Sequence, residues 1–216
     1  MEVVITDKIK LSREDNMELM SRYEDNYFDL AIVDPPYGIK RFQQTNRDGS
    51  DNYSVRLKAS QLNEWDKKPH IMYWNDLFRV SKNQIVWGAN NFNLPTTEYF
   101  CIWDKKQVLP NFARCEYAWV SMGLKKPAKI FEYAIHKHNH KTKIHPTQKP
   151  VKLYEWLLMN YAKKGDKILD THLGSGSIAI ACHNLGFDLT ACELDEEYFN
   201  AACKRIEHHT KQLRMF

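Results

Sequence analysis

The fold of this chain is decided by residues 167–177, KILDTHLGSGS. Residues 167–170 form a short apolar run that ends in an acid, a pattern that predicts a buried strand. Two glycines then permit a tight turn. Apolar residues at helical spacing follow up to Gly186, and 189–192 predict the next strand, with Glu193 at its end. Strand, glycine loop, helix, strand and acid in this order are typical of one nucleotide-binding half of a doubly wound α/β sheet.

The glycine loop also indicates the kind of ligand that it would hold. Gly174 and Gly176 would let the backbone approach a ligand closely, and Glu193 stands where a carboxylate accepts hydrogen bonds from ribose hydroxyls. The third glycine of the dinucleotide fingerprint is replaced, and the lysine of nucleoside-triphosphate loops is missing. The acid before the loop, Asp170, suits an ammonium better than a pyrophosphate. S-adenosylmethionine carries both an ammonium and a ribose; the alternative is a plain crossover with structural glycines.

A second motif, Asp34-Pro35-Pro36-Tyr37, follows the apolar run at 28–33, which predicts another buried strand. The prolines fix two φ angles and remove two N–H donors, so we expect backbone carbonyls there to be free to accept hydrogen bonds. Tyr37 offers a flat face on which a planar ring could stack. Acceptors beside an aromatic plate suit an exocyclic amine on a flat heterocycle.

The rest of the chain predicts one α/β domain over residues 1–216, which is long enough to bury a sizeable core. Further strands are predicted at 3–7, 85–87, 99–103, 117–120 and 131–135, and further helices at 14–20, 71–78, 151–161 and 196–207. Residues 38–60 are polar with little periodicity, which predicts a long mobile loop. Because it follows Tyr37 directly, we expect this loop to act as a lid or to grip the substrate.

Positive charge is concentrated in one segment. Residues 121–152 carry eight lysines and one acid, a charge of +7, whereas the remaining residues sum to −3. This distribution predicts a polyanionic partner, and the alternative is a solvated lysine-rich loop. His136, His138 and His140 alternate in the same segment and could share one face of a strand. No carboxylate or cysteine stands near enough to complete a metal site, so we expect phosphate contact or solvent exposure and no metal.

Composition excludes several other classes of protein. The apolar runs are too short for a membrane span, and the first residues lack a signal-peptide pattern. The five cysteines are an odd number without a Cys-x-x-Cys pair. We therefore expect reduced, mostly buried thiols in an intracellular protein and no zinc site.

Taken together, three motifs resemble those of the amino-methylating DNA methyltransferases. They are Asp34 to Tyr37, the stretch His145-Pro146-Thr147-Gln148-Lys149-Pro150, and Asp170 to Ser177. The catalytic motif precedes the cofactor loop, which resembles the circularly permuted β group of that family. The resemblance extends from Asp15 to Arg205. It implies a Rossmann-like S-adenosylmethionine-dependent fold with a doubly wound, mostly parallel sheet.

The resemblance also implies a role for each matching residue. Asp34 and the Pro35 carbonyl would accept hydrogen bonds from the target amine, and Tyr37, after Pro36, would stack on the flipped base. Around the cofactor, Asp170 and the backbone at Gly174, Ser175 and Gly176 would hold the methionine end, Glu193 the ribose and Asp15 the adenine. His145, Pro146, Thr147 and Lys149 would line the cofactor pocket from the helix before the loop. Tyr198 and Arg205 would be structural.

One departure from the family pattern concerns the cofactor loop. The family usually has Asp-Pro-Phe-x-Gly-Ser-Gly-Thr, where the Phe packs against the cofactor, but this chain has Thr171 and His172 instead. His172 would stack in a similar way or add a hydrogen bond. The region available for reading DNA is also short, 121–144 together with the loop at 38–60. This predicts a brief recognition site or help from a partner chain.

The implied function is site-specific methylation of the N6 amine of adenine in duplex DNA, after the base is flipped out of the helix. Phosphates would be held by basic residues of the loop and of the lysine-rich segment: Arg41, Arg47, Lys125, Lys126, Lys129, Lys141 and Lys143. N4-cytosine methylation is the alternative, although cytosine members of the family more often carry Ser where Asp34 stands. An inactive DNA-binding regulator on the same scaffold is the alternative of another class.

The expected partner is double-stranded DNA, with no membrane contact. A homodimer is compatible with the resemblance, as is a cognate restriction nuclease that acts on the same site without forming a stable complex. The resemblance implies a cytoplasmic protein of a prokaryote or a phage.

Overall fold

The computed structural model describes residues 1–38, 67–110, 112–134, 143–145 and 147–212, and these contain one nine-stranded sheet with the order β1-β2-β9-β8-β3-β4-β6-β5-β7. Five of its eight pairings are parallel: β2 with β9, β9 with β8, β8 with β3, β3 with β4, and β5 with β7. The expected α/β architecture with a mostly parallel, doubly wound sheet is therefore confirmed.

The elements have the following bounds. The strands are β1 (Glu2–Thr6), β2 (Ile9–Arg13), β3 (Leu30–Val33), β4 (Gln84–Trp87), β5 (Phe100–Asp104), β6 (Cys115–Val120), β7 (Lys129–Glu132), β8 (Lys167–Asp170) and β9 (Asp188–Glu193). The helices are α1 (Asn16–Ser21), α3 (Ile71–Val80), α4 (Val151–Tyr161), α5 (Ser177–Leu185) and α6 (Glu196–Lys211), with short 3₁₀ turns η2 (Ala89–Asn91) and η3 (Met122–Leu124).

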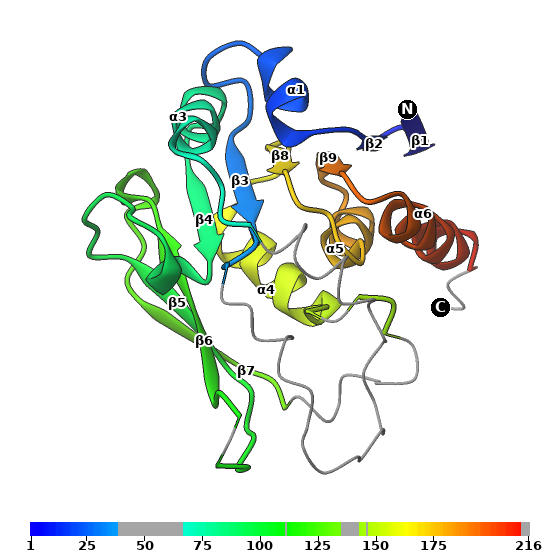
Figure 1. Cartoon of the computed structure of the whole chain (residues 1–216). Helices are drawn as coiled ribbons and strands as arrows, with labels where there is room; N and C mark the ends of the chain where they lie inside the picture. The colour runs from blue at the N-terminus through cyan, green and yellow to red at the C-terminus, as the bar shows by residue number, and fades with distance from the viewer. Residues whose placement is uncertain (39–66, 111, 135–142, 146, 213–216) are drawn as a thin grey trace.

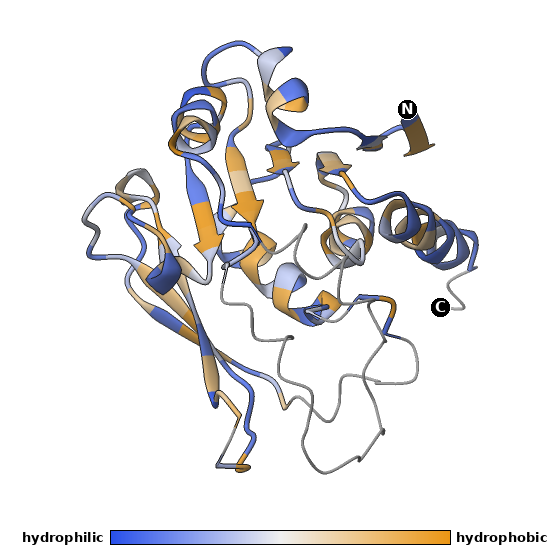
Figure 2. Ribbon diagram, viewed as in Figure 1, coloured by the Kyte–Doolittle hydropathy of each residue, from blue (hydrophilic) through white to orange (hydrophobic). Residues whose placement is uncertain are grey.

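Helices cover both faces of the sheet, which explains the continuous apolar runs in its central strands. In β3, Leu30 and Ile32 pack into the cluster that contains α4, α5 and α6, whereas Ala31 and Val33 pack with α1 and α3. Figure 1 shows these two groups of helices on opposite sides of the sheet, and Figure 2 shows the apolar strands between them. The result is a three-layer sandwich.

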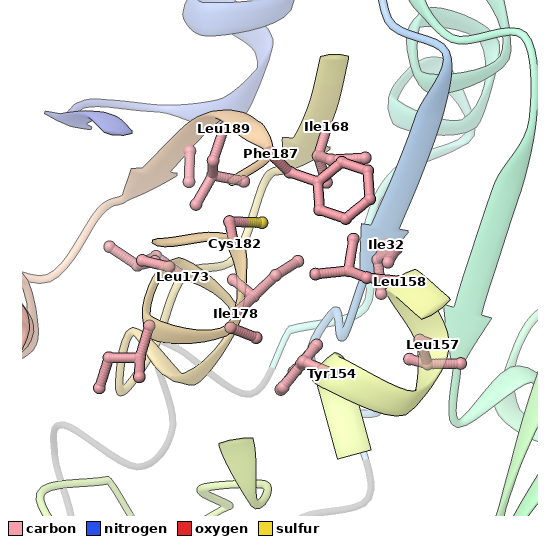
Figure 3. Packing of buried hydrophobic residues seen from close by; sticks show 14 of the residues in the cluster. Ile32, Tyr154, Leu157, Leu158, Ile168, Leu173, Ile178, Cys182, Phe187 and Leu189 are labelled. Carbon is pink, nitrogen blue, oxygen red and sulfur yellow. The ribbon is translucent and has the colours of Figure 1, made fainter. Parts of the chain in front are cut away.

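The larger cluster joins the two halves of the sheet to their helices. Figure 3 shows Ile32 of β3 beside Leu158 of α4, and Ile168 of β8 beside Phe187, with Ile178 and Cys182 of α5 close by. Each of these side chains belongs to the buried cluster. This packing fixes the position of α5 relative to β8. The loop between them is therefore held at both of its ends.

The strand order at the centre of the sheet determines where the site lies. From β8 the chain crosses over α5 to β9 on one side, whereas β3 lies on the other side of β8. Strands β2, β9, β8, β3 and β4 are mutually parallel, so their carboxyl ends share one edge. In open α/β sheets, ligands bind outside this edge, at the point where the strand order reverses.

Most predicted elements are present with shifted ends, and three expectations need correction. Strand β2 was not expected, because its alternating Ile9 and Leu11 follow the first strand after only a short turn. The last helix continues to Lys211. Residues 143–145 and 147–150 precede α4 and do not belong to a helix. The five cysteines are free, and four of them are buried while Cys115 is exposed.

Several predicted segments lie partly or wholly outside the described residues. They include the loop at 38–60 beyond Gly38 and the three alternating histidines 136, 138 and 140. Of the predicted DNA-reading stretch 121–144, the described part contains η3 and β7, and β7 extends the sheet next to β5. Within the described ranges, no helix has the length and apolar character that crossing a membrane requires.

Candidate active site

Three acids from distant parts of the sequence lie at neighbouring strand ends. Asp34 follows β3, Asp170 ends β8 and Glu193 ends β9, and β8 pairs with both of the other strands. The fold therefore brings the Asp-Pro-Pro-Tyr motif and the glycine loop to the same edge of the sheet.

Both carboxylate oxygens of Asp34 have partners in this structure. The Tyr37 hydroxyl donates to Oδ1 at 2.6 Å, and the Lys149 ammonium donates to Oδ2. Pro35 is buried and Pro36 half-buried in the extended turn that carries the motif. The turn therefore holds the Asp34 carboxylate in a fixed orientation at the end of β3.

The ring of Tyr37 lies against Gly88, the residue after β4. Gly88 has a φ of +65°, and a Cβ built on it would lie 2.1 Å from Cε1 of Tyr37. Phe92 meets the same ring edge-on at a centroid distance of 6.1 Å. Burial, followed by the nearby Asp34 and Glu116 carboxylates, raises the pKa of Tyr37 well above its usual value. Its hydroxyl is therefore a hydrogen-bond donor throughout the neutral range.

Lys149 forms the centre of a buried charge cluster, which we define as Asp34, Lys149, Glu116 and Lys105. The Lys149 side chain is only 3% exposed, and its Nζ lies 3.2 Å from Glu116 Oε2 on β6 and 5.6 Å from the centroid of the Trp87 ring. Glu116 Oε1 pairs with Lys105 at 2.5 Å. Burial opposes the charged form of Lys149, but Asp34 and Glu116 outweigh it and raise the pKa, so the ammonium stays protonated.

The glycine loop is fixed by contacts from β9 and α6. Gly174 N donates to Glu193 Oε2 at 2.8 Å, and Asp195 N donates to Oε1 of the same carboxylate at 3.0 Å. Arg205 reaches back from α6 and donates to the Ser175 carbonyl at 2.6 Å. Arg205 thus has a structural contact, and Glu193 touches the loop directly.

Gly176 explains why the loop needs a second glycine. It has a φ of +72° at the start of α5, and a Cβ there would lie 2.7 Å from Cδ1 of Ile206 on α6. Any larger residue would push α6 away from the loop that it supports. Gly176 therefore permits the close packing of α6 against the loop as well as the left-handed turn itself.

Asp170 is an acid with an unusual environment. Its side chain is almost fully buried, and the His172 backbone N–H donates to its Oδ1 at 3.0 Å. Burial raises the pKa of Asp170 to about 8, and the neighbouring Asp34 and Glu193 carboxylates add to this effect. A cation placed beside this carboxyl would favour its ionised form. The site is thus suited to an ammonium group.

His172 takes part in a hydrogen-bond chain inside the protein. Its Nδ1 lies 2.9 Å from Thr171 Oγ1, which lies 2.7 Å from the Tyr73 hydroxyl, and its Nε2 lies 3.2 Å from Asn16 Nδ2. The ring also meets Tyr73 edge-on at 5.4 Å. Burial lowers the pKa of His172 to about 3, so the ring is neutral. Both ring nitrogens are therefore occupied by protein groups.

The remaining predicted cofactor residues lie around the same loop. The His145 ring would be 3.8 Å from a Cβ on Gly174 and meets Tyr198 edge-on at 4.3 Å. Its Nδ1 lies 3.0 Å from Oγ1 of the exposed Thr147, and burial lowers the pKa of His145 to about 4. The hydroxyl of Tyr198 is buried without a hydrogen-bond partner among the described residues.

Two of the predicted cofactor residues have other contacts. Asp15 caps α1 by accepting a hydrogen bond from Met17 N at 2.7 Å, as N-cap acids commonly do. The carbonyl of Lys149 accepts from Ser177 Oγ at 2.8 Å, but its ammonium points to Asp34. The side chain of Lys149 therefore belongs to the acceptor half of the site, whereas its backbone borders the loop. Pro146 lies outside the described residues.

The residues predicted to bind DNA are only partly described. Lys125 and Lys126 are exposed after η3, whereas Lys129 is half-buried and donates to Asn160 Oδ1 at 3.0 Å. Lys143 is half-buried, and burial together with Lys105 lowers its pKa. Arg41, Arg47 and Lys141 lie outside the described residues. Because Lys149 is also buried, the free positive charge of this segment is smaller than the sequence indicated.

Sequence reasoning did not identify Glu116, Tyr73 or Asn16 as parts of the site. Glu116 stands at the start of a strand, where an acid normally faces solvent, and Tyr73 belongs to the apolar pattern of α3. Only Asn16 had a signal, since it follows Asp15 at the end of β2. All three reach the site through tertiary packing.

The sheet order and the two motifs at its carboxyl edge define an enzyme of the Rossmann-like methyltransferase class. The chain belongs to the N6_N4_Mtase family, described as DNA methylase, whose model matches residues 60–204, more than half of its length.

Type II DNA methyltransferases are among the proteins similar to this chain in sequence. The type II methyltransferase M.HpaI of Haemophilus parainfluenzae is 25% identical, with 88% of this chain and 72% of that protein covered. M2.DpnII of Streptococcus pneumoniae is 24% identical, with 93% and 90% covered.

Solved structures share the fold. The cytosine-N4-specific PvuII DNA methyltransferase has a TM-score of 0.61 at 14% identity, with 94% of this chain and 92% of that chain covered. The complex of M1.HpyAVI with SAM has a TM-score of 0.56 at 19% identity, with 90% and 98% covered.

Proposed function

We propose that this DNA methylase transfers a methyl group from S-adenosylmethionine to the N6 amine of adenine at a specific site in duplex DNA. The observation that carries the proposal is the position of Asp34 and Asp170 at the ends of the adjacent strands β3 and β8. An amine acceptor and an ammonium-binding loop thus share one edge. A carboxylate at position 34, where cytosine enzymes of the family more often have Ser, favours adenine over cytosine.

The residues at this edge fit the proposed cofactor. The Asp170 carboxyl is suited to the ammonium of the methionine end, and Glu193, which accepts from Gly174 N, would hold the ribose. The Tyr198 hydroxyl, buried and without a hydrogen-bond partner among the described residues, belongs to a ring that meets His145. When bound, S-adenosylmethionine supplies an electrophilic methyl group on a sulfonium. The protein contributes the orientation of that methyl group towards the amine and the exclusion of water from the site.

Asp34 would make the target amine a better nucleophile. The lone pair of an aromatic amine is delocalised into its ring. A carboxylate that accepts an N–H bond, together with the Pro35 carbonyl, favours a pyramidal nitrogen on which the lone pair is localised. As the N–C bond forms, the bond from the methyl group to sulfur breaks and leaves a neutral thioether. The nitrogen then carries one proton too many, and Asp34 is placed to receive it. Interactions made mainly in the transition state raise kcat.

DNA would be held by exposed cations outside the site, among them Lys125 and Lys126. Because the target amine lies inside the duplex, the base must be flipped out, at a cost of a few kcal/mol, and Tyr37 would then stack on it. The loop at 38–60 and the stretch 121–144 would read the flanking sequence. The relatives named above are bacterial, which supports a cytoplasmic site of action. A homodimer and a cognate nuclease stay predictions, which sedimentation and gene context would test.

The test of the proposed function is transfer of tritium from methyl-labelled S-adenosylmethionine to plasmid DNA. Digestion to nucleosides and chromatography then separate N6-methyladenine from N4-methylcytosine, and long-read sequencing gives the site. Label in N6-methyladenine supports the proposal, and label in N4-methylcytosine would assign the alternative base. DNA binding without any label would instead indicate the regulator.

The affinity for the cofactor is expected to rise with pH between about 6 and 7.5. In this range the cofactor's α-amino group stays largely protonated, whereas Asp170, whose pKa is about 8, must lose its proton to pair with it. The dissociation constant should therefore fall by up to about tenfold per pH unit. Titration calorimetry at pH 6, 6.75 and 7.5 measures it, with Asp170→Asn as the control that binds weakly and without this slope. A wild-type affinity independent of pH would contradict the assignment.

A further inference from the structure

We propose that Glu116 is a positioning residue of the methyl transfer. When the target amine binds Asp34, the Lys149 ammonium leaves Asp34 and forms its hydrogen bond with the Glu116 carboxylate instead. The inference rests on the proposed function, because it assumes that Asp34 accepts the amine. It concerns a residue on β6, outside all three motifs of the sequence.

The first argument is competition for Asp34. Its Oδ2 is bonded to the Lys149 ammonium, and its Oδ1 accepts from Tyr37. An incoming amine needs one of these oxygens. The Tyr37 hydroxyl is held by a ring packed against Gly88 and Phe92, whereas the lysine ammonium ends a flexible four-carbon chain. Lys149 is therefore the group that gives way.

The second argument is that a second acceptor is already in place. Glu116 Oε2 lies 3.2 Å from the Lys149 Nζ but is not aligned for a hydrogen bond, and it is buried without any other partner among the described residues. The other oxygen, Oε1, is held by Lys105 at 2.5 Å. Oε2 is therefore in ion-pair contact with the ammonium without a hydrogen bond, and a buried acceptor that lacks a hydrogen bond costs free energy until it gains one. A small movement of the ammonium away from Asp34 would supply that hydrogen bond.

The third argument is charge. The buried charge cluster contains two carboxylates and two ammonium groups, so it is neutral as a whole. During methyl transfer, positive charge develops on the target nitrogen. An ammonium that stays beside Asp34 would oppose this positive charge unless another carboxylate compensates it. Glu116 would keep the charge of Lys149 compensated while Asp34 serves the amine.

Glu116→Gln is expected to raise the KM for duplex DNA and to lower kcat, each by roughly tenfold, the size of a typical coupling between two sites. Lys149 would then stay on Asp34, and any amine that displaces it would meet an uncompensated charge. Glu116→Asp should recover part of both losses. Affinity for S-adenosylmethionine should be unchanged, because Glu116 touches no residue of the glycine loop.

The matched control is Asp29→Asn. Asp29 also pairs with a lysine, Lys82 at 2.6 Å, and its side chain is 27% exposed, compared with 25% for Glu116. It precedes β3 and so lies at the opposite edge of the sheet. Asp29→Asn should keep its activity. If both variants instead lost activity and their melting temperatures fell equally, Glu116 would have a merely structural role and the proposal would be overturned.

A double-mutant cycle with Lys149→Met tests whether Glu116 acts through Lys149. Binding of duplexes with adenine at the target position, measured with S-adenosylhomocysteine because it has no methyl group to transfer, gives a readout without turnover. If the proposal is right, Glu116→Gln weakens binding in the wild-type background and has no further effect once Lys149 is Met. Equal effects in both backgrounds would overturn it. Failure of the wild-type enzyme to label DNA at all would instead count against the proposed function.

Discussion

Asp34→Ala is expected to lower kcat for DNA methylation by roughly 10²–10³-fold, the usual effect of removing one transition-state hydrogen-bond partner. The carboxylate is the charged acceptor of the Asp-Pro-Pro-Tyr motif, and it lies at the end of β3 beside the cofactor loop. Affinity for S-adenosylmethionine should change by a few-fold at most. Tritium transfer and titration calorimetry measure the two quantities separately.

The structure adds an effect on stability that the sequence did not predict. Removing Asp34 leaves the buried Lys149 ammonium with Glu116 alone, and breaking a buried ion pair typically costs about 3–5 kcal/mol. We expect the lower end of this range for Asp34→Ala, because Glu116 stays in place. Asp34→Asn retains the shape of the side chain and is the better test of chemistry. An Asn variant that folds well and keeps full kcat would refute the assigned role.

The architecture could be predicted because its signals are local. The apolar run Leu30–Val33 is continuous since both faces of β3 are covered, and Asp170 and Gly174 mark the turn after β8 by residue type alone. Parallel strands then place Asp34 and Asp170 at one edge without further information. Strand β2 was missed because its apolar residues, Ile9 and Leu11, are only two in number and follow another strand closely.

The buried charge cluster could not be predicted, because it depends on long-range pairing. Strand β4 is followed in the chain by β5 but pairs with β6, and only this order brings Glu116 towards Lys149. Lys149 was included in the +7 charge of residues 121–152 and was predicted to line the cofactor pocket, yet its side chain is 3% exposed and its ammonium points to Asp34. Whether a lysine is buried depends on which carboxylates tertiary packing places around it. In this chain they come from positions 34 and 116.

Gly88→Ala is expected to disable the acceptor site from outside the Asp-Pro-Pro-Tyr motif. The new Cβ would overlap the Tyr37 ring, with 2.1 Å to Cε1 and 2.3 Å to Cζ. Gly88 itself cannot retreat, because its N–H donates to the Tyr117 carbonyl and its own carbonyl accepts from Asn91 N, both at 2.9 Å. Tyr37 must therefore move, which breaks its hydrogen bond to Asp34. We expect kcat to fall by about 10²-fold and stability by about 2–4 kcal/mol, from overpacking and the left-handed backbone.

Gly186→Ala separates these two causes of instability. Gly186 has a φ of +76°, similar to that of Gly88, but a Cβ there would meet nothing within 4 Å. This variant should lose only the backbone contribution, about 1–2 kcal/mol, and keep its activity. Thermal unfolding and tritium transfer on both variants measure the difference. Tyr37→Ala in the Gly88→Ala background should restore much of the stability but not the activity, because it removes the clash together with the ring. If Gly88→Ala instead behaved like Gly186→Ala in both measurements, the position of Tyr37 would not matter for the reaction.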